Sequence, residues 1–188
     1  MPNFITRYLQ AKNLREALKP EPVPEGQEIP QPVLSKEVKT VMVLVDVTDP
    51  TWKDIRAKAM QLFIDRCISG QVVYVYPAKL DKKTILTTPP DQTVTMVDIS
   101  RFGKPLTDKI PLITAQKPDV LINLVQDTSF MLEYIVRVSG ARYKIGRVEF
   151  DPVAYDMLLK DARDEPLSPM ESFCAIIDYL DKMKWKVL

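Results

Sequence analysis

The stretch Val41-Met42-Val43-Leu44-Val45, which runs into Asp46-Val47-Thr48-Asp49-Pro50, decides the fold class of this chain of 188 residues. An unbroken apolar run of this kind is typical of a strand that is covered on both faces of a sheet. Residues 72–76 (Val-Val-Tyr-Val-Tyr) and 119–124 (Asp-Val-Leu-Ile-Asn-Leu) have the same character. Strands buried on both faces occur in parallel sheets, where a helix usually connects one strand to the next.

A helical pattern follows the first of these strands. Apolar residues recur at helical spacing from Trp52 to Cys67. Asp49 before Pro50 fits an N-cap followed by proline at the first helical position. Gly70 fits the left-handed residue that ends a helix. The sequence therefore predicts a helix that begins at about residue 50 and ends before Gly70.

Two more helices are predicted in the second half of the chain. The first has an apolar stripe that starts at Met131, a cap at Thr128 or Ser129, and an end at Gly140. The second begins with Ser168-Pro169-Met170-Glu171, which has the spacing of a capping box with proline at the first helical position. A short helix is also expected within residues 107–116.

Weaker strands are expected at residues 94–97 and 143–148, and residues 155–159 are either a sixth strand or one helical turn. Strands that alternate with helices predict an α/β fold. Because crossovers between parallel strands are right-handed, helices should cover both faces of the sheet. We therefore predict a three-layer Rossmann-like sandwich with a mostly parallel sheet of five or six strands.

The N-terminal part, residues 1–36, is expected to stand apart from the α/β domain at residues 37–188. Residues 3–18 have a weak helical stripe made of Phe4, Tyr8, Ala11, Leu14 and Leu18. Five prolines within residues 20–32 predict an extended linker. The helix is expected to pack on the domain or on a partner, with peripheral contact to a membrane surface as the alternative.

Composition excludes several classes of chemistry. The chain has no histidine, which removes Ser-His-Asp and Cys-His catalysis and histidine-ligated zinc. Its 26 basic and 25 acidic residues give no net charge that favours nucleic acid. Gly103-Lys104 precedes Pro105, so it is no phosphate-binding P-loop. We expect no metal, no cofactor and no nucleic-acid partner.

The two cysteines bear on the cellular compartment. Cys67 and Cys174 both fall on apolar stripes of predicted helices, which predicts two buried, reduced thiols. The chain has no apolar run that resembles a signal peptide or a transmembrane helix. A cytoplasmic protein is therefore expected.

Candidate ligand-binding residues follow the predicted strands. In doubly wound sheets, ligands bind at the carboxyl ends of the strands. Carboxylates, an amide, hydroxyls and one guanidinium fall there, and together they suit a phosphorylated ligand. Asp49 and Asp127 are also explained as caps before helices, and Asp46 as a residue that bonds its own loop. The candidates are Asp46, Thr48, Asp49, Asn123, Asp127, Thr128 and Arg147.

Two resemblances bear on the fold and the function. Residues 119–124, a helix, and the run 138–147 (Val-Ser-Gly-Ala-Arg-Tyr-Lys-Ile-Gly-Arg) resemble the N-terminal domain of heptosyltransferase-like glycosyltransferases. That resemblance implies a Rossmann-like fold. The whole chain also resembles an uncharacterised bacterial single-domain family, through its basic N-terminal helix, Phe102-Gly103-Lys104-Pro105 and Ile145-Gly146-Arg147.

Two functional hypotheses follow. The resembling enzymes carry a second domain that holds most of the nucleotide-sugar site, and this chain has no such domain. The first hypothesis is therefore a non-catalytic module that binds a protein partner or a small phosphorylated ligand, with the N-terminal helix as a docking arm. The alternative is an enzyme that acts on a phosphorylated or nucleotide-sugar substrate, with Asp46 or Asp49 transferring the proton.

Overall fold

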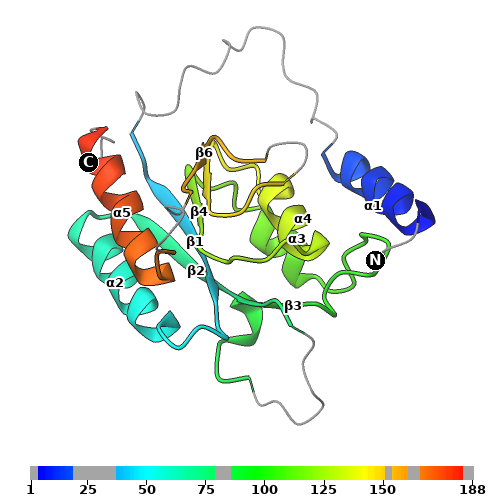
Figure 1. The fold of residues 1–188 in the computed structure, drawn as a ribbon, viewed down its shortest axis with the longest axis horizontal. Helices are drawn as coiled ribbons and strands as arrows, with labels where there is room; N and C mark the ends of the chain where they lie inside the picture. The colour runs from blue at the N-terminus through cyan, green and yellow to red at the C-terminus, as the bar shows by residue number, and fades with distance from the viewer. Residues whose placement is uncertain (1–3, 19–36, 79–85, 151–153, 161–165, 184–188) are drawn as a thin grey trace, which may run out of the picture.

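A single parallel sheet organises the computed structural model, which describes residues 4–18, 37–78, 86–150, 154–160 and 166–183 (Figure 1). Its strand order is β3-β2-β1-β4-β5-β6, and every neighbouring pair is parallel. This order is the one typical of Rossmann folds. It confirms the predicted α/β Rossmann-like class, with residues 157–158 as the sixth strand. The strands are β1 (Thr40–Asp46), β2 (Ser69–Tyr76), β3 (Thr93–Thr95), β4 (Val120–Asn123), β5 (Tyr143–Gly146) and β6 (Met157–Leu158).

Helices cover both faces of the sheet, as predicted. α2 and α5 pack together on one face, and α3 and α4 lie on the other (Figure 1). α1 lies outside α4, at the edge of the molecule farthest from α2 and α5. The helical elements are α1 (Phe4–Ala17), α2 (Trp52–Asp65), a short 3-10 helix η2 (Pro90–Gln92), α3 (Lys109–Thr114), α4 (Phe130–Val138) and α5 (Pro169–Lys182).

The strand β1 explains why the apolar run is unbroken. Val41, Val43 and Val45 belong to the core beneath α2 and α5. Met42 and Leu44 point the other way, into the core beneath α3 and α4. Both faces of the strand are therefore buried, and no position is left for a polar residue. Burying each of these side chains stabilises the fold by about 1.5–3 kcal/mol.

The start of α2 corrects one prediction. The N-cap is Thr51 and not Asp49. The Asp49 carboxylate folds back on its own loop and accepts hydrogen bonds from the Thr51 backbone N–H (2.8 Å) and hydroxyl (2.5 Å). A side chain that forms this local turn does not reach the first turn of the helix. The helix therefore begins at Trp52.

The end of α2 corrects a second prediction. The helix ends at Asp65, and Gly70 lies within β2 rather than at a helix cap. Cys67 takes the positive φ (52°) of the turn instead. Gly70 is required for packing, since a Cβ there would lie 2.1 Å from the Phe63 ring.

The prediction of two buried thiols is wrong. Cys67 is exposed because the last turn of the predicted helix is not helical. Cys174, on α5, is half-buried. Its Sγ lies 3.0 Å from Lys58 Nζ of α2, and this hydrogen bond raises the pKa of Lys58. The cysteines therefore give no support to a particular compartment, and a cytoplasmic location stays a prediction.

The remaining helix signals are confirmed, with Ser129 rather than Thr128 as the cap of α4. The Ser129 side chain accepts a hydrogen bond from the Leu132 N–H at 3.4 Å. Gly140, with φ of 61°, follows α4 in the left-handed conformation. At α5, Ser168 Oγ accepts from the Glu171 N–H (3.2 Å), and the Glu171 carboxylate accepts from the Ser168 N–H (2.8 Å). Both halves of the predicted capping box are therefore present.

The helix α1 packs on the domain through a face that the sequence did not predict. Gln10 and Asn13 donate side-chain hydrogen bonds to the carbonyls of residues 101 (3.0 Å) and 102 (2.6 Å). Leu14 packs against the core beside α4, and Thr6 is buried. Tyr8, a member of the predicted stripe, is 62% exposed. The predicted linker at residues 20–32 lies outside the described residues.

Candidate functional site

The strand order places the predicted site at the point where the chain changes direction. The chain builds β1, β2 and β3 outward, then returns to add β4 on the other side of β1. Ligand crevices of doubly wound sheets lie at this point, at the carboxyl ends of the strands. Asp46 ends β1, and Asn123 ends β4 beside Leu44 of β1. Residues from these two loops are the first candidates for a site.

The polar side chains of the loop after β1 form hydrogen bonds within that loop. Asp46 Oδ1 accepts hydrogen bonds from the Thr48 backbone N–H (2.7 Å) and hydroxyl (2.6 Å). Asp49 makes the equivalent contacts with Thr51. Two of the predicted carboxylates therefore hold the shape of the β1–α2 loop. This agrees with the alternative that Asp46 bonds its own loop.

The end of β4 is filled by a side chain that the sequence analysis missed. The buried Asn123 amide donates to the Tyr155 hydroxyl (2.7 Å) and to the carbonyl of Val125 (3.4 Å), and its oxygen accepts from the Val125 N–H (3.1 Å). The Tyr155 ring stacks on Phe150 with centroids 5.7 Å apart. Both aromatic side chains come from the segment that follows β5.

Gly146 makes room for this aromatic side chain. A Cβ on Gly146 would lie 2.4 Å from Cζ of Tyr155. Burial raises the pKa of Tyr155 well above its ordinary value, so its hydroxyl stays neutral. The glycine within a strand was the signal in the sequence, since it marks a close approach by another group.

Arg147 connects the end of β5 to the start of α5. Its side chain is 7% exposed, and Nη2 donates to the carbonyl of Leu167, the residue before the Ser168 cap. The first turn of α5 is already satisfied by the side chains of Ser168 and Glu171. The N-terminus of α5 therefore holds a carboxylate of its own chain, at the place where an anionic ligand would bind.

Asp127 and Thr128 lie in the loop between β4 and α4. Thr128 is exposed and Asp127 is half-buried. Asp127 Oδ2 is buried and accepts no hydrogen bond from the described residues. Among the predicted carboxylates, Asp127 is therefore the one with a buried oxygen for which the described residues supply no donor.

A further buried carboxylate at this edge was not predicted. Asp98 follows β3 and is 2% exposed. It forms an ion pair with Lys109 (2.9 Å) and accepts from the Thr95 N–H (2.8 Å), the Thr95 hydroxyl (2.9 Å) and the Thr107 hydroxyl (3.1 Å). Burial alone would raise the pKa of Asp98, but the hydrogen bonds from Lys109 and Thr95 and the charge of Lys109 outweigh it and lower the pKa. These contacts hold the loop between β3 and α3.

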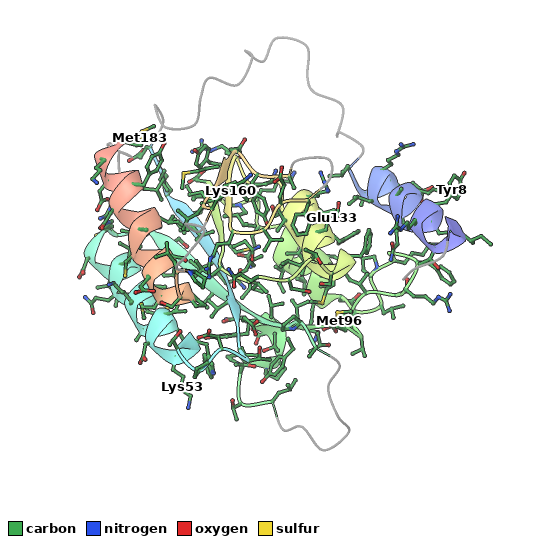
Figure 2. The ribbon with its side chains drawn as sticks, in the orientation of Figure 1. Tyr8, Lys53, Met96, Glu133, Lys160 and Met183 are labelled. Carbon is green, nitrogen blue, oxygen red and sulfur yellow. The ribbon has the colours of Figure 1, made fainter. Side chains whose placement is uncertain are left out.

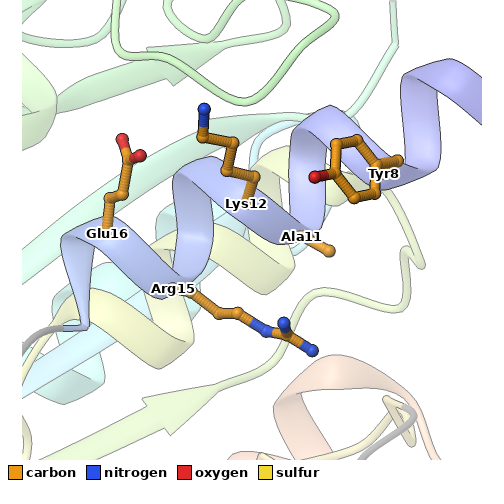
Figure 3. A pocket seen from close by; sticks show the side chains of 5 residues that line it. All are labelled: Tyr8, Ala11, Lys12, Arg15 and Glu16. Carbon is orange, nitrogen blue, oxygen red and sulfur yellow. The ribbon is translucent and has the colours of Figure 1, made fainter.

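Two cavities of the structure lie away from the carboxyl edge. One of about 460 Å³ runs along the outer face of α1 (Figure 3). The other, of about 270 Å³, lies at the amino ends of β1 and β2. No three histidine, cysteine, aspartate or glutamate side chains in the described ranges are grouped so that they could hold a metal ion. The described helices include none that is long and apolar enough to cross a membrane.

Comparison with known proteins identifies a family but no activity. No curated protein and no solved structure matches the chain. The resemblance to heptosyltransferase-like enzymes is thus not supported by any solved relative. One family matches residues 8–181, a range that includes most of α1 and nearly all of α5. The chain belongs to this family of unknown function, DUF6913.

Proposed function

We propose that this protein is a non-catalytic binding module that docks a protein partner through the outer face of α1. One observation carries the proposal. Polar side chains at the carboxyl edge are paired within the chain, Asp46 with Thr48 and Asn123 with Tyr155. The outer face of α1, in contrast, presents Tyr8 to solvent.

The outer face of α1 has the composition of a contact surface. Among the described residues, those that line the 460 Å³ cavity all belong to α1: Tyr8, Ala11, Lys12, Arg15 and Glu16 (Figure 3). Figure 2 shows Tyr8 on the side of α1 that faces away from the sheet. Tyrosine and arginine are enriched in protein–protein interfaces. A partner that offers an apolar pocket flanked by carboxylates would complement this face.

A protein partner suits α1 better than a lipid surface does. Apolar and polar side chains are only weakly segregated around α1. Helices that lie on membranes have strongly segregated faces. The match of the family to residues 8–181 also includes most of the helix, which supports a role for α1 in the common module.

Site-specific photo-crosslinking in the producing cells tests the proposal. A photoreactive residue is placed at position 8, and in a control protein at position 61, an exposed position on α2. We expect a discrete cross-linked product with another protein from position 8 only. Tyr8→Glu combined with Arg15→Glu should prevent association without lowering the melting temperature by more than a few degrees. Equal cross-linking from both positions, or cross-linking to lipid alone, would contradict the proposal.

An enzyme is the second candidate function, and Asp127 and Arg147 are the observations that favour it. Asp127 has a buried oxygen to which none of the described residues donates, and Arg147 is a buried cation that follows β5. A phosphorylated substrate would then contact Arg147, and Asp46 or Asp49 would transfer the proton.

A further inference from the structure

Three glutamines from separate parts of the chain line one cavity at the amino end of the sheet. Gln71 lies in β2, Gln92 is the last residue of η2, and Gln116 follows α3. All three line the cavity of about 270 Å³. The remaining described lining residues are Thr40, Val41, Met42, Ser69, Gly70 and Pro118. This cavity lies at the end of the sheet opposite to the predicted site.

The strand register puts Gln71 on the α3 face of the sheet. Gln71 is the register partner of Met42 in β1, and Met42 belongs to the core beneath α3 and α4. Val73 and Val75, the next residues of β2 on that face, are buried apolar side chains of the same core. Gln71 therefore occupies a position where the pattern of the strand favours an apolar residue. A polar residue in such a position calls for a physical reason.

The Gln71 side chain also carries an unmet hydrogen-bonding group. Its Oε1 atom is buried and accepts no hydrogen bond from the described residues. A buried acceptor without a donor destabilises the folded state. The atom has almost no accessible surface, so it reaches a ligand only after the Gln71 side chain rotates toward the cavity. A ligand that donates an O–H group to the rotated amide would supply the missing hydrogen bond.

The residues that line the cavity indicate which kind of ligand it would bind. Its described polar side chains are amides and hydroxyls, which both donate and accept hydrogen bonds, and none of them is charged. A phosphate or carboxylate would lose its hydration without gaining a cation. No described lining residue is aromatic, so a nucleobase would have no ring on which to stack. At a share of about 30 Å³ per water molecule, the volume holds about nine waters.

We propose that the three glutamines form a binding site for a small, uncharged, polyhydroxylated compound of about the size of a monosaccharide. Each glutamine amide would pair a donor and an acceptor with a hydroxyl group of the ligand. After a rotation of its side chain toward the cavity, Gln71 would accept a hydrogen bond from one ligand O–H through Oε1. This site is separate from the outer face of α1, so its existence does not depend on the proposed partner.

Nuclear magnetic resonance of the full chain tests the site directly. Uniformly ¹⁵N-labelled protein is titrated with glucose, galactose, mannose and ribose as uncharged probes, and with glucose 6-phosphate and adenosine as comparison compounds. The highest concentration saturates a site with a Kd of about 1 mM. At least one uncharged sugar should shift the side-chain NH₂ signals of Gln71, Gln92 and Gln116. The signals of Gln61 on α2 and Gln10 on α1 should not move.

Variants decide whether the glutamines bind the sugar. Gln71→Leu should abolish the shifts of the other two glutamines, and Gln61→Leu should leave them unchanged. Gln116 is exposed, so Gln116→Ala keeps the fold and should weaken binding at least several-fold. The proposal is overturned if none of the four sugars moves the three signals. It is equally overturned if glucose 6-phosphate or adenosine binds as tightly as the sugar, or if binding survives Gln71→Leu.

Discussion

Two amide side chains at opposite ends of the sheet, Asn123 and Gln71, differ in whether the described residues supply their hydrogen-bond partners. At the carboxyl end, where Rossmann-like folds bind their ligands, Asp98 and Asn123 are buried and bonded to their own chain. At the amino end, Gln71 lines a cavity, and its buried Oε1 accepts no hydrogen bond from the described residues. A polar residue at the carboxyl edge of the sheet is therefore no evidence for a ligand site until its hydrogen-bond partners are known.

The ion pair of Asp98 gives the largest expected effect. Asp98→Ala removes the partner of Lys109 and the acceptor of three further donors. The free energy of unfolding in urea should fall by about 3 kcal/mol, as expected when a buried pair loses one member. The lowered pKa of Asp98 makes its stabilisation present above pH ~4 and lost as the pH falls below that value. The variant should therefore lose less stability in acid than the wild type does.

A loss of less than about 1 kcal/mol in the free energy of unfolding of Asp98→Ala would contradict this account of the carboxyl end of the sheet. It would mean that the buried carboxylate is not held for structural reasons. Asp108→Ala is the matched control, since Asp108 is an exposed neighbour whose side chain makes no cap hydrogen bond to α3.

The Tyr155 hydroxyl gives an intermediate effect with a distinctive pH dependence. Tyr155→Phe deletes the hydrogen bond from Asn123 and should cost about 1 kcal/mol at pH 7. Because burial raises the pKa of Tyr155, the folded state keeps its proton at a pH where the unfolded state loses it. The stabilisation is therefore full below pH ~10 and is lost as the pH rises above that value.

Urea unfolding of both proteins between pH 7 and pH 11 measures this difference. The advantage of the wild type should shrink above pH ~10 and then reverse, because phenylalanine has no proton to lose. Burial also raises the pKa values of Tyr74, Tyr134 and Tyr143, but these residues are common to both proteins and cancel in the comparison. Parallel curves across this range would show that Tyr155 is not buried in the folded protein.

Gln71→Leu should have the smallest effect, and the effect should be of opposite sign. The substitution removes a buried acceptor to which no described residue donates, and it puts an apolar residue beside Met42. The ligand-free protein should gain up to about 1 kcal/mol in its free energy of unfolding. The exposed Gln61→Leu should change stability by less than about 0.5 kcal/mol. A loss of stability in Gln71→Leu would show that its amide serves the fold rather than a ligand.

The elements that were predicted correctly depend on signals from residues that are close together in the sequence. The apolar run at residues 41–45 and the capping box at Ser168 each depend on residues a few positions apart, and both are confirmed. The prediction of Asp49 as the N-cap is wrong because its carboxylate forms a local turn with Thr51. Helix caps and turns of this kind favour the same residue types, so the sequence does not distinguish them. The prediction that Cys67 is buried is wrong because the helix ends at Asp65, before it reaches that cysteine.

The sequence predicted which candidate residues share an edge of the sheet, but it did not predict their hydrogen-bond partners. The topology brought Asp46 and Asn123 to the ends of neighbouring strands, as parallel strands require. The bond from Asn123 to Tyr155 joins positions 32 residues apart. No periodicity or motif reports a contact of that kind. Gln71 gave no signal either, because a polar residue near the start of a strand is ordinary in a sequence.

The most direct test of the account is a thermal-shift screen of the wild-type protein against nucleotides, nucleotide-sugars, sugar phosphates and divalent metals. A ligand at 100 times its Kd stabilises a fold by about 2.7 kcal/mol, which raises the melting temperature by several degrees. We predict no shift from these compounds, because Asp46, Asp49 and Asn123 at the carboxyl edge are engaged within the chain. A shift that disappears in Asp46→Asn or Arg147→Ala would contradict the account and favour the enzyme.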